Sequence, residues 1–349
     1  MPRPCVLPEW APQDAVLLAW PHPDSDWGPL WPQIENDFLR LARLIAAHEP
    51  LLVLVRDAAH RRHLGRRLWH DRVFVCEVPT DDTWCRDFGP LAVAGDGGPT
   101  LVDFRFNAWG GRYPWAQDDA ATARLAALGA FAAPLRRADM VLEGGSLDSD
   151  GAGTLLTTRR CQLDGRRNPA LAGDPAAFAE ALGRHLPFER LIWLESGLLE
   201  GDDTDAHVDN LARFTDPRTL VYAASLDPDD PHHEPLTKLA EELAALRTAD
   251  GRPYRLVPLP LPAARHSRVD GRRLPASYVN FLVINGAVLV PQFGDRLTDH
   301  LALSRLAGCF PGRRVIGVDS RGFIEQNGGI HCLTMQLPAG SVAWERLRR

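Results

Sequence analysis

Apolar residues along the chain alternate between helical spacing and short continuous runs. Ile34, Phe38, Leu41 and Ile45 recur on one helix face, and the run 51–55 that follows is typical of a buried strand. The same patterns predict further helices over about 119–131, 174–182, 236–246 and 296–306. Strands are predicted at 101–106, 154–157, 191–194, 219–223, 279–284, 287–290 and 315–318. Helices and strands therefore alternate, which indicates an α/β fold.

The predicted helices begin at similar intervals. Starts near residues 119, 175, 235 and 296 are separated by about 60 residues, which favours five α/β units of similar size. An irregular α/β domain produces such spacing by chance, so the periodicity leaves both architectures open. The segment 227–234, rich in Asp, Pro and His, is predicted to be a solvated surface excursion.

The composition limits the fold and function classes further. The 349 residues include 29 Gly and 29 Pro, which favours many short elements joined by tight turns over a long helical bundle. Lys and Arg number 39 against 45 Asp and Glu, and the resulting net charge of −6 argues against a broad nucleic-acid surface. A chain of this length allows one large or two average domains.

The cysteines and the first residues of the chain indicate the cellular compartment. The six cysteines form no CxxC pair, and a chain of this size folds without disulfides. Met1-Pro2-Arg3-Pro4 lacks the apolar core of a signal peptide, and the most apolar stretch, 41–55, is broken by His48-Glu49-Pro50. We expect reduced thiols in a cytoplasmic protein without membrane contact.

Four segments place reactive polar residues among glycines and aromatic residues. They are 82–90, 143–146, 202–210 and 327–332. Each lies between different predicted helices, so they meet only if the fold brings loops of different units to one face.

Cys332 follows a glycine-rich turn, where a substrate has room to approach. It fits a nucleophile that needs a base or cationic neighbour, but also a small buried apolar residue. His207 and Asp209 are alternate residues, which would face the same side of an extended segment and suit general acid/base chemistry. A metal site with the aspartates at 202, 203 and 205, or a structural pair, stays open.

The other dense motifs supply carboxylates and an indole. Asp87 stands beside Arg86, so it either forms an ion pair or serves a site; Glu143 precedes two glycines. Trp84 fits the core or a cation contact worth about 0.5–2 kcal/mol. Two carboxylates bind a planar guanidinium through paired charge-assisted hydrogen bonds, after which a thiolate can attack its central carbon.

The chain resembles the agmatine deiminase family, which is grouped with bacterial-type peptidylarginine deiminases. The likeness runs from about residue 8 to 338 and is carried by long motifs in order. The matching segments are Pro8-Glu9-Trp10, Ala19-Trp20-Pro21-His22, 82–90, Asn107-Ala108-Trp109-Gly110-Gly111, Glu143-Gly144-Gly145-Ser146, His207-Val208-Asp209-Asn210, Ser277-Tyr278-Val279-Asn280-Phe281 and Gly328-Gly329-Ile330-His331-Cys332.

The resemblance implies a pentein fold, a five-bladed α/β propeller forming a single domain over 1–349. It implies hydrolysis of agmatine to N-carbamoylputrescine and ammonia through a covalent thiouronium intermediate, with no metal or organic cofactor. The implied roles are nucleophile for Cys332, general acid/base for His207, guanidinium binding for Asp87 and Asp209, support for Glu143, and substrate contact for Trp84, Trp109 and Asp203.

Three departures from the family pattern bear on the substrate. Asp203 and Ala206, in the segment 202–206, stand where Glu and Gly are common before the histidine. Gly329 stands where Asn is common, and Asp164-Gly165, after Cys161, stand where an Asn-Pro pair is usual. The tail end of the substrate is therefore left open between agmatine and a peptidyl-arginine, free arginine or another guanidino compound. A substrate carboxylate would call for an arginine such as Arg112. A metal-dependent hydrolase built on His207 and a non-catalytic guanidine-binding protein are the alternatives outside this chemistry, and the oligomeric state is open.

Overall fold

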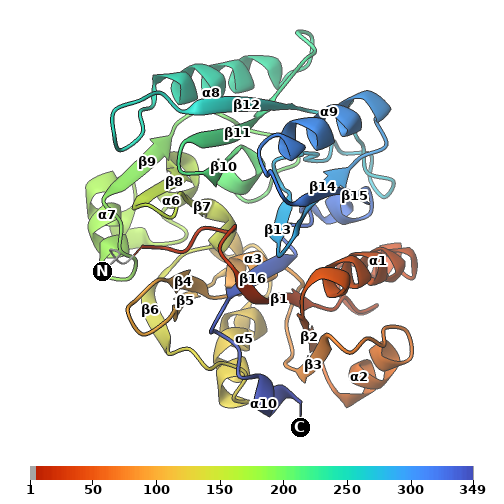
Figure 1. Cartoon of the computed structure of the whole chain (residues 1–349). Helices are drawn as coiled ribbons and strands as arrows, with labels where there is room; N and C mark the ends of the chain where they lie inside the picture. The colour runs from red at the N-terminus through yellow and green to blue at the C-terminus, as the bar shows by residue number, and fades with distance from the viewer. Residues whose placement is uncertain (1–4, 349) are drawn as a thin grey trace.

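The computed structural model describes residues 5–348 and arranges them as five small sheets around a common centre (Figure 1). The first sheet, in the order β16-β1-β2-β3, contains β1 (Gln13–Ala19), β2 (Leu51–Val55), β3 (Val73–Glu77) and the last strand, β16 (Thr334–Pro338). The other sheets are β4 (Leu91–Val93), β5 (Thr100–Arg105), β6 (Leu135–Val141); β7 (Leu147–Ser149), β8 (Thr154–Thr158), β9 (Arg190–Leu194); β10 (Ala212–Asp216), β11 (Thr219–Ala224), β12 (Arg255–Pro260); and β13 (Leu282–Ile284), β14 (Ala287–Gln292), β15 (Arg314–Asp319).

The five sheets share one topology. An antiparallel pair comes first, and a helix then returns the chain to a third strand that lies parallel to the second. The first sheet follows the same rule, with β16 as its opening strand. The connecting helices are α1 (Gln33–His48), α5 (Ala116–Ala127), α7 (Pro175–Gly183), α8 (His233–Ala245) and α9 (Arg296–Ala307). The prediction of five similar α/β units is confirmed.

Shorter helices complete the chain. They are α2 (Ala58–Gly65), α3 (Cys85–Phe88), α4 (Ala108–Gly111), α6 (Arg159–Gln162), α10 (Trp344–Leu347) and the 3-10 turns η1 (Gly28–Leu30), η2 (Gly144–Ser146), η3 (Pro169–Leu171), η4 (Val208–Asn210) and η5 (Phe323–Gln326).

Most predicted elements are confirmed with shifted ends. Asp174 caps α7 by accepting hydrogen bonds from the backbone of Ala176 and Ala177, as an Asp before Pro favours. Two extents were wrong: α5 ends at Ala127 rather than 131, and 279–281 lies outside β13. The helix α2 was not predicted, because its mostly polar sequence buries only His60 and Leu64.

The segment 227–234 is only partly the solvated excursion that its composition suggests. Its first residues are exposed, but His232 is buried. Its Nε2 accepts a hydrogen bond from the Glu200 backbone at 2.8 Å, and its Nδ1 lies 3.0 Å from Asp230. The prediction of a solvated His232 was wrong, since this ring anchors the start of α8.

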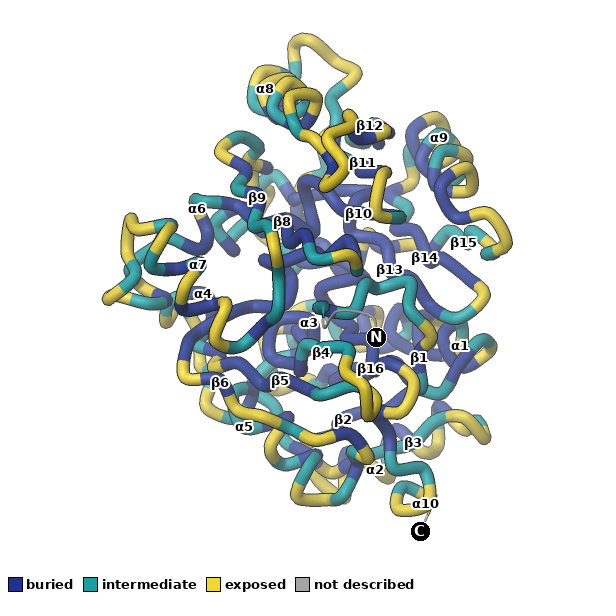
Figure 2. The backbone as a smooth tube through the Cα atoms, turned by 60° about the vertical axis from the view of Figure 1, so that its left-hand side comes forward, coloured by how far each residue is buried: buried dark blue, intermediate teal, exposed yellow. Residues whose placement is uncertain are grey.

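The ring closes where the two ends of the chain meet. Strand β16 pairs antiparallel with β1, placing Thr334 opposite Leu18 and Gln336 opposite Val16. The buried backbone concentrates around this centre, while exposed segments lie on outer helices and loops (Figure 2). Within the described residues, every helix is too short or too polar to cross a membrane. The prediction drawn from Met1-Pro2-Arg3-Pro4 lies outside those residues.

The contribution of ring closure to the free energy of unfolding can be measured. Leu337 on β16 is fully buried, so Leu337→Ala should lower the free energy of unfolding by about 2–5 kcal/mol. Leu297 on α9 is 65% exposed, and Leu297→Ala should change it by no more than about 0.5 kcal/mol. Urea unfolding of both variants measures the difference. Equal midpoints for the two would show that β16 adds nothing to stability.

Candidate active site

The four polar segments predicted from the sequence meet at the centre of the ring. In every unit, the residues just before the opening strand point toward this centre. Those strands are β4, β7, β10, β13 and β16, and the residues are Asp87, Glu143, His207 with Asp209, Asn280 and Cys332. The fivefold arrangement therefore joins positions that are far apart in the sequence (Figure 1).

Cys332 is held by groups from two other units. The Asn280 side-chain amide donates to its Sγ at 3.0 Å, and Sγ lies 3.4 Å from Asp209 Oδ2. Burial raises the pKa of the Cys332 thiol well above its usual value, and the charges of Asp209 and Asp87 raise it further. The thiol is thus protonated while the site holds no cation.

Asp87 and Asp209 are fixed by donors on their outer sides. Asp87 accepts hydrogen bonds from Trp109 Nε1 and from the Gly145 backbone, both at 2.9 Å. Burial raises the pKa of Asp87 to about 6, since the charge of His207 offsets it only in part. Asp209 Oδ2 lies 2.9 Å from His331 Nδ1; although burial opposes ionisation, this contact helps to hold the pKa of Asp209 below its usual value.

His207 lies between two carboxylates. Its Nδ1 is 3.7 Å from Asp87 Oδ1, and its Nε2 is 3.3 Å from Glu143 Oε2. Although burial by itself lowers the pKa of His207, the charge of Asp87 and contacts with Cys161 and Glu143 raise it well above its usual value. This imidazole is charged at neutral pH in the free protein, which suits a proton donor.

The expected extended conformation around His207 and Asp209 was wrong, because Asp209 lies in the 3-10 turn η4. Both side chains nevertheless reach one point. A Cβ added at Gly145 would lie 2.9 Å from His207 Nδ1, 3.0 Å from Asp209 Oδ2 and 2.8 Å from Asp87 Oδ1. Glycine is needed at 145 because the three side chains converge there.

The negative charge of Glu143 is balanced by a buried arginine. Arg167 Nε donates to both Glu143 oxygens, at 2.9 and 2.8 Å, and its Nη1 lies 2.9 Å from Asp205. Burial favours the neutral acid, but Arg167 and His207 hold the pKa of Glu143 below its usual value. Glu143 therefore stays charged and orients His207.

A pocket leads to Cys332 and is lined by acidic and aromatic side chains. Its described lining consists of Asp26, Asp82, Trp84, Asp87, Trp109, Tyr113, Asp203, Thr204, Asn210, Gln326, Asn327, Gly328 and Cys332. It includes four carboxylates and no lysine or arginine. Asp203 Oδ2 accepts from the Tyr113 hydroxyl at 3.0 Å and the Asn327 amide at 3.1 Å. Such a pocket suits a cation with apolar stretches.

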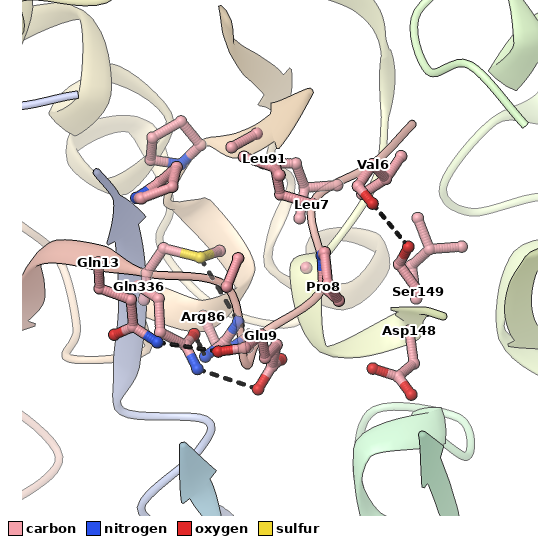
Figure 3. A pocket seen from close by; sticks show the side chains of 17 residues that line it. Val6, Leu7, Pro8, Glu9, Gln13, Arg86, Leu91, Asp148, Ser149 and Gln336 are labelled. Carbon is pink, nitrogen blue, oxygen red and sulfur yellow. Dashed lines mark hydrogen bonds and ion pairs between the residues drawn. The ribbon is translucent and has the colours of Figure 1, made fainter. Parts of the chain in front are cut away.

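The two arginines considered from the sequence have other partners. Arg112 pairs with Asp205 at 2.7 Å and is not part of the described pocket lining. Arg86 pairs with Glu9 at 3.2 Å rather than with its neighbour Asp87, in a second cavity (Figure 3). Asp87 therefore forms no ion pair with Arg86 in the described structure; it lies beside His207 and the Gly145 backbone instead.

The second cavity is connected to the first by hydrogen-bonded side chains. Figure 3 shows Glu9, Arg86 and Gln336 gathered at one side of it. Glu9 Oε1 lies 2.7 Å from His331 Nε2, and the opposite nitrogen of that ring contacts Asp209. The buried pairing of Glu9 therefore fixes Asp209 beside the thiol.

Backbone strain is concentrated at the same place. The described non-glycine residues with positive φ all lie in short segments around the site: Ala108 and Trp109 in α4, whose backbone is not regularly helical there, and Asp205, Ala206 and Asn327 in bends or turns. Ala206 has a φ of 70°, which lies in the left-handed region that favours glycine. Strain held at a site is one way of pre-organising it.

Four residues of the site were not predicted from the sequence. Asn280, His331 and Glu9 stand within motifs that carried the family resemblance, but their types alone assign no role. Arg167 lies in the segment after Cys161 and gave no signal apart from its charge. Their partners lie 24 to 322 residues away in the sequence.

The metal ligands considered from the sequence are not brought together. Asp205 binds Arg112 and Arg167, while Asp202 accepts from Thr204 and from the Ala206 backbone. In the described part of the chain, the ligand-type group that contains His207 joins it instead to Glu143 and Cys161.

Comparisons with known proteins agree with this geometry. Residues 5–338 match the model of the Porphyromonas-type peptidyl-arginine deiminase family. The agmatine deiminase of Ectopseudomonas mendocina is 35% identical, over 95% of this chain and 94% of its own. A crystal structure from Porphyromonas gingivalis, whose name gives arginine deiminase as a proposed activity, has a TM-score of 0.91 at 45% identity, covering 97% and 100% of the two chains.

A further solved structure holds a ligand. A variant agmatine deiminase of C. jejuni with substrate bound has a TM-score of 0.88 and 33% identity, covering 96% of each chain. Together with the five sheets described above, these similarities confirm the pentein fold.

The charge of Asp209 should control the thiol. Asp209→Asn removes an anion beside Sγ, so the pKa of Cys332 should fall and the thiolate fraction at neutral pH should rise. Alkylation of Cys332 by iodoacetamide, followed by peptide mass spectrometry across pH, should shift to lower pH. Asp203→Asn is the control, since Asp203 is not among the groups that raise this pKa. An unchanged profile for Asp209→Asn would contradict the electrostatic account.

Proposed function

Because this chain belongs to the Porphyromonas-type peptidyl-arginine deiminase family, we propose that it hydrolyses agmatine to N-carbamoylputrescine and ammonia. The observation that carries the proposal is the pocket in front of Cys332, with four carboxylates and no basic side chain in its described lining. We propose further that the five units act as one catalytic domain.

The pocket fits both ends of agmatine. Asp87 and Asp209, beside Cys332, are suited to pair with the planar guanidinium. Asp203, held by Tyr113 and Asn327, is the carboxylate we assign to the distant ammonium. Free arginine carries a carboxylate at that end, which would face Asp203 without an arginine to pair with it.

The first half of the reaction forms the covalent intermediate. The bound guanidinium offsets the charges that raise the Cys332 pKa, so substrate binding favours the thiolate. Sγ attacks the guanidinium carbon, and the charged His207 donates a proton to a departing nitrogen. The C–N bond breaks and ammonia leaves, which yields a thiouronium on Cys332 and a neutral imidazole.

The second half releases the product. Neutral His207 takes a proton from water as the water oxygen attacks the same carbon. The C–S bond then breaks, its electron pair returns to sulfur, and a proton passes to ammonia. Glu143, with Arg167 behind it, keeps the imidazole in place through both halves. Trp84 and Trp109 border the guanidinium end of the pocket.

Ammonia release from a panel of agmatine, free arginine and a peptidyl-arginine tests the proposed function. We expect agmatine to be the preferred substrate, because its tail ends in an ammonium and carries no other charge. Free arginine carries a carboxylate beside its ammonium, and a peptidyl-arginine has no free ammonium at that end. Cys332→Ser should reduce the rate at least about 1,000-fold, since the covalent route is lost. If agmatine releases no ammonia while another guanidine is turned over, the substrate assignment is overturned.

Asp203 should act on substrate binding more than on the chemical step. Asp203→Asn keeps the shape but removes the charge, so KM for agmatine should rise about tenfold with a smaller change in kcat. Steady-state kinetics measures both constants. Asp24→Asn, an exposed change outside the described pocket lining, is the matched control. A fall in kcat with KM unchanged would argue against this role of Asp203.

A further inference from the structure

Cys161 is a buried thiol beside the site that the proposed mechanism does not use. It lies in α6, is fully buried, and places its Sγ 3.7 Å from Glu143 Oε2. It also lies beside His207, since the ligand atoms of the two side chains are within 4.8 Å of each other. A second nucleophilic side chain therefore stands next to the imidazole, outside the described lining of the substrate pocket.

Two separations between ligand atoms of this cluster are close to those in a tetrahedral zinc site. The ligand atoms of Cys161, His207 and Glu143 all lie within 4.8 Å of one another. Bonds of about 2.0 Å to nitrogen or oxygen and about 2.3 Å to sulfur put tetrahedral ligands about 3.3 Å apart for N and O, and about 3.5 Å for S and O. The observed separations are 3.3 Å for His207 Nε2 to Glu143 Oε2, and 3.7 Å for Cys161 Sγ to the same oxygen.

The ligand set also opposes the charge of the ion. A thiolate and a carboxylate together neutralise a divalent cation, and imidazole completes a ligand set that zinc prefers. The opposing group is Arg167, which donates to both oxygens of Glu143. Its other nitrogens are held by Asp205 and the Thr204 carbonyl, so it stays in place while Glu143 shares Oε2 with a metal.

We propose that Cys161, His207 and Glu143 form a binding site for Zn²⁺ whose occupancy inhibits the enzyme. Binding displaces the protons of the thiol and of Nε2 and leaves the ring unable to become an imidazolium. The site lies outside the described lining of the substrate pocket, so the metal and the substrate bind together. Zinc should therefore lower kcat and leave KM unchanged.

Metal binding is tested without activity. Chelator-treated Cys332→Ser protein is titrated with Zn²⁺ in a calorimeter, and with Co²⁺ to follow the thiolate-to-cobalt absorption band. We expect one metal per chain. Adding Cys161→Ser or Cys161→Ala should abolish the band and weaken zinc binding at least about tenfold. Adding Cys309→Ser, at a buried thiol outside the cluster, should change neither; thermal unfolding checks that each variant is folded.

Inhibition is the second readout, and it rests on the proposed function. Zinc should inhibit the parent and Cys309→Ser without competing with agmatine, and Cys161→Ser should need at least about tenfold more zinc, relative to its own uninhibited rate. Competitive inhibition, or tight binding that survives loss of Cys161 and disappears in Cys332→Ser, would place the metal on the nucleophile and overturn the proposal. If no guanidine is turned over, the proposed function fails while the calorimetry still decides the site.

Discussion

The active centre depends on the pairing of β16 with β1, which closes the ring. Cys332 stands two residues before β16, and the other site residues stand just before the opening strands of the remaining sheets. Without closure, Cys332 would belong to an unpaired chain segment, and the other four units would enclose an incomplete centre. One strand pair thus links global stability to the position of a single sulfur, which explains why chemistry and fold share the same short segments.

Within that ring, buried charges are divided into two kinds. Glu9 and Glu143 have arginine partners in the protein, and these partners hold the pKa of each carboxyl below its usual value despite burial. Asp87 and Asp82 have no such partner, and burial raises the pKa of each to about 6. Burying an uncompensated carboxylate is costly, so these positions favour a cation from outside. A positively charged substrate would offset the negative charge of these two carboxylates.

Helices and strands that depend on neighbouring residues were predicted from the sequence. Roles that depend on contacts between distant segments were missed. Apolar spacing located α1, β2 and β9 closely because burial of one face or of a whole strand leaves a direct pattern. Motifs located Cys332 and His207, but the conformation expected around His207 was wrong, because Asp209 lies in the 3-10 turn η4 and the spacing of two polar residues does not distinguish such a turn from an extended segment. Asn280 and Arg167 could not be assigned roles, since an amide or guanidinium gains a role only from the partner that folding supplies.

The two ends of the substrate pocket differ in how freely they can change. At the guanidinium end, a Cβ at Gly329 would lie 2.3 Å from Asn280 Oδ1, and one at Gly328 would lie 2.1 Å from the Trp84 ring. Backbone and side chains interlock there, so substitution moves the groups that hold the sulfur. At the far end, the Asp203 carboxylate accepts side-chain hydrogen bonds from Tyr113 and Asn327. Under the proposed function, exchange of those three side chains would change which substrate tail fits, while the groups packed around Cys332 would stay in place.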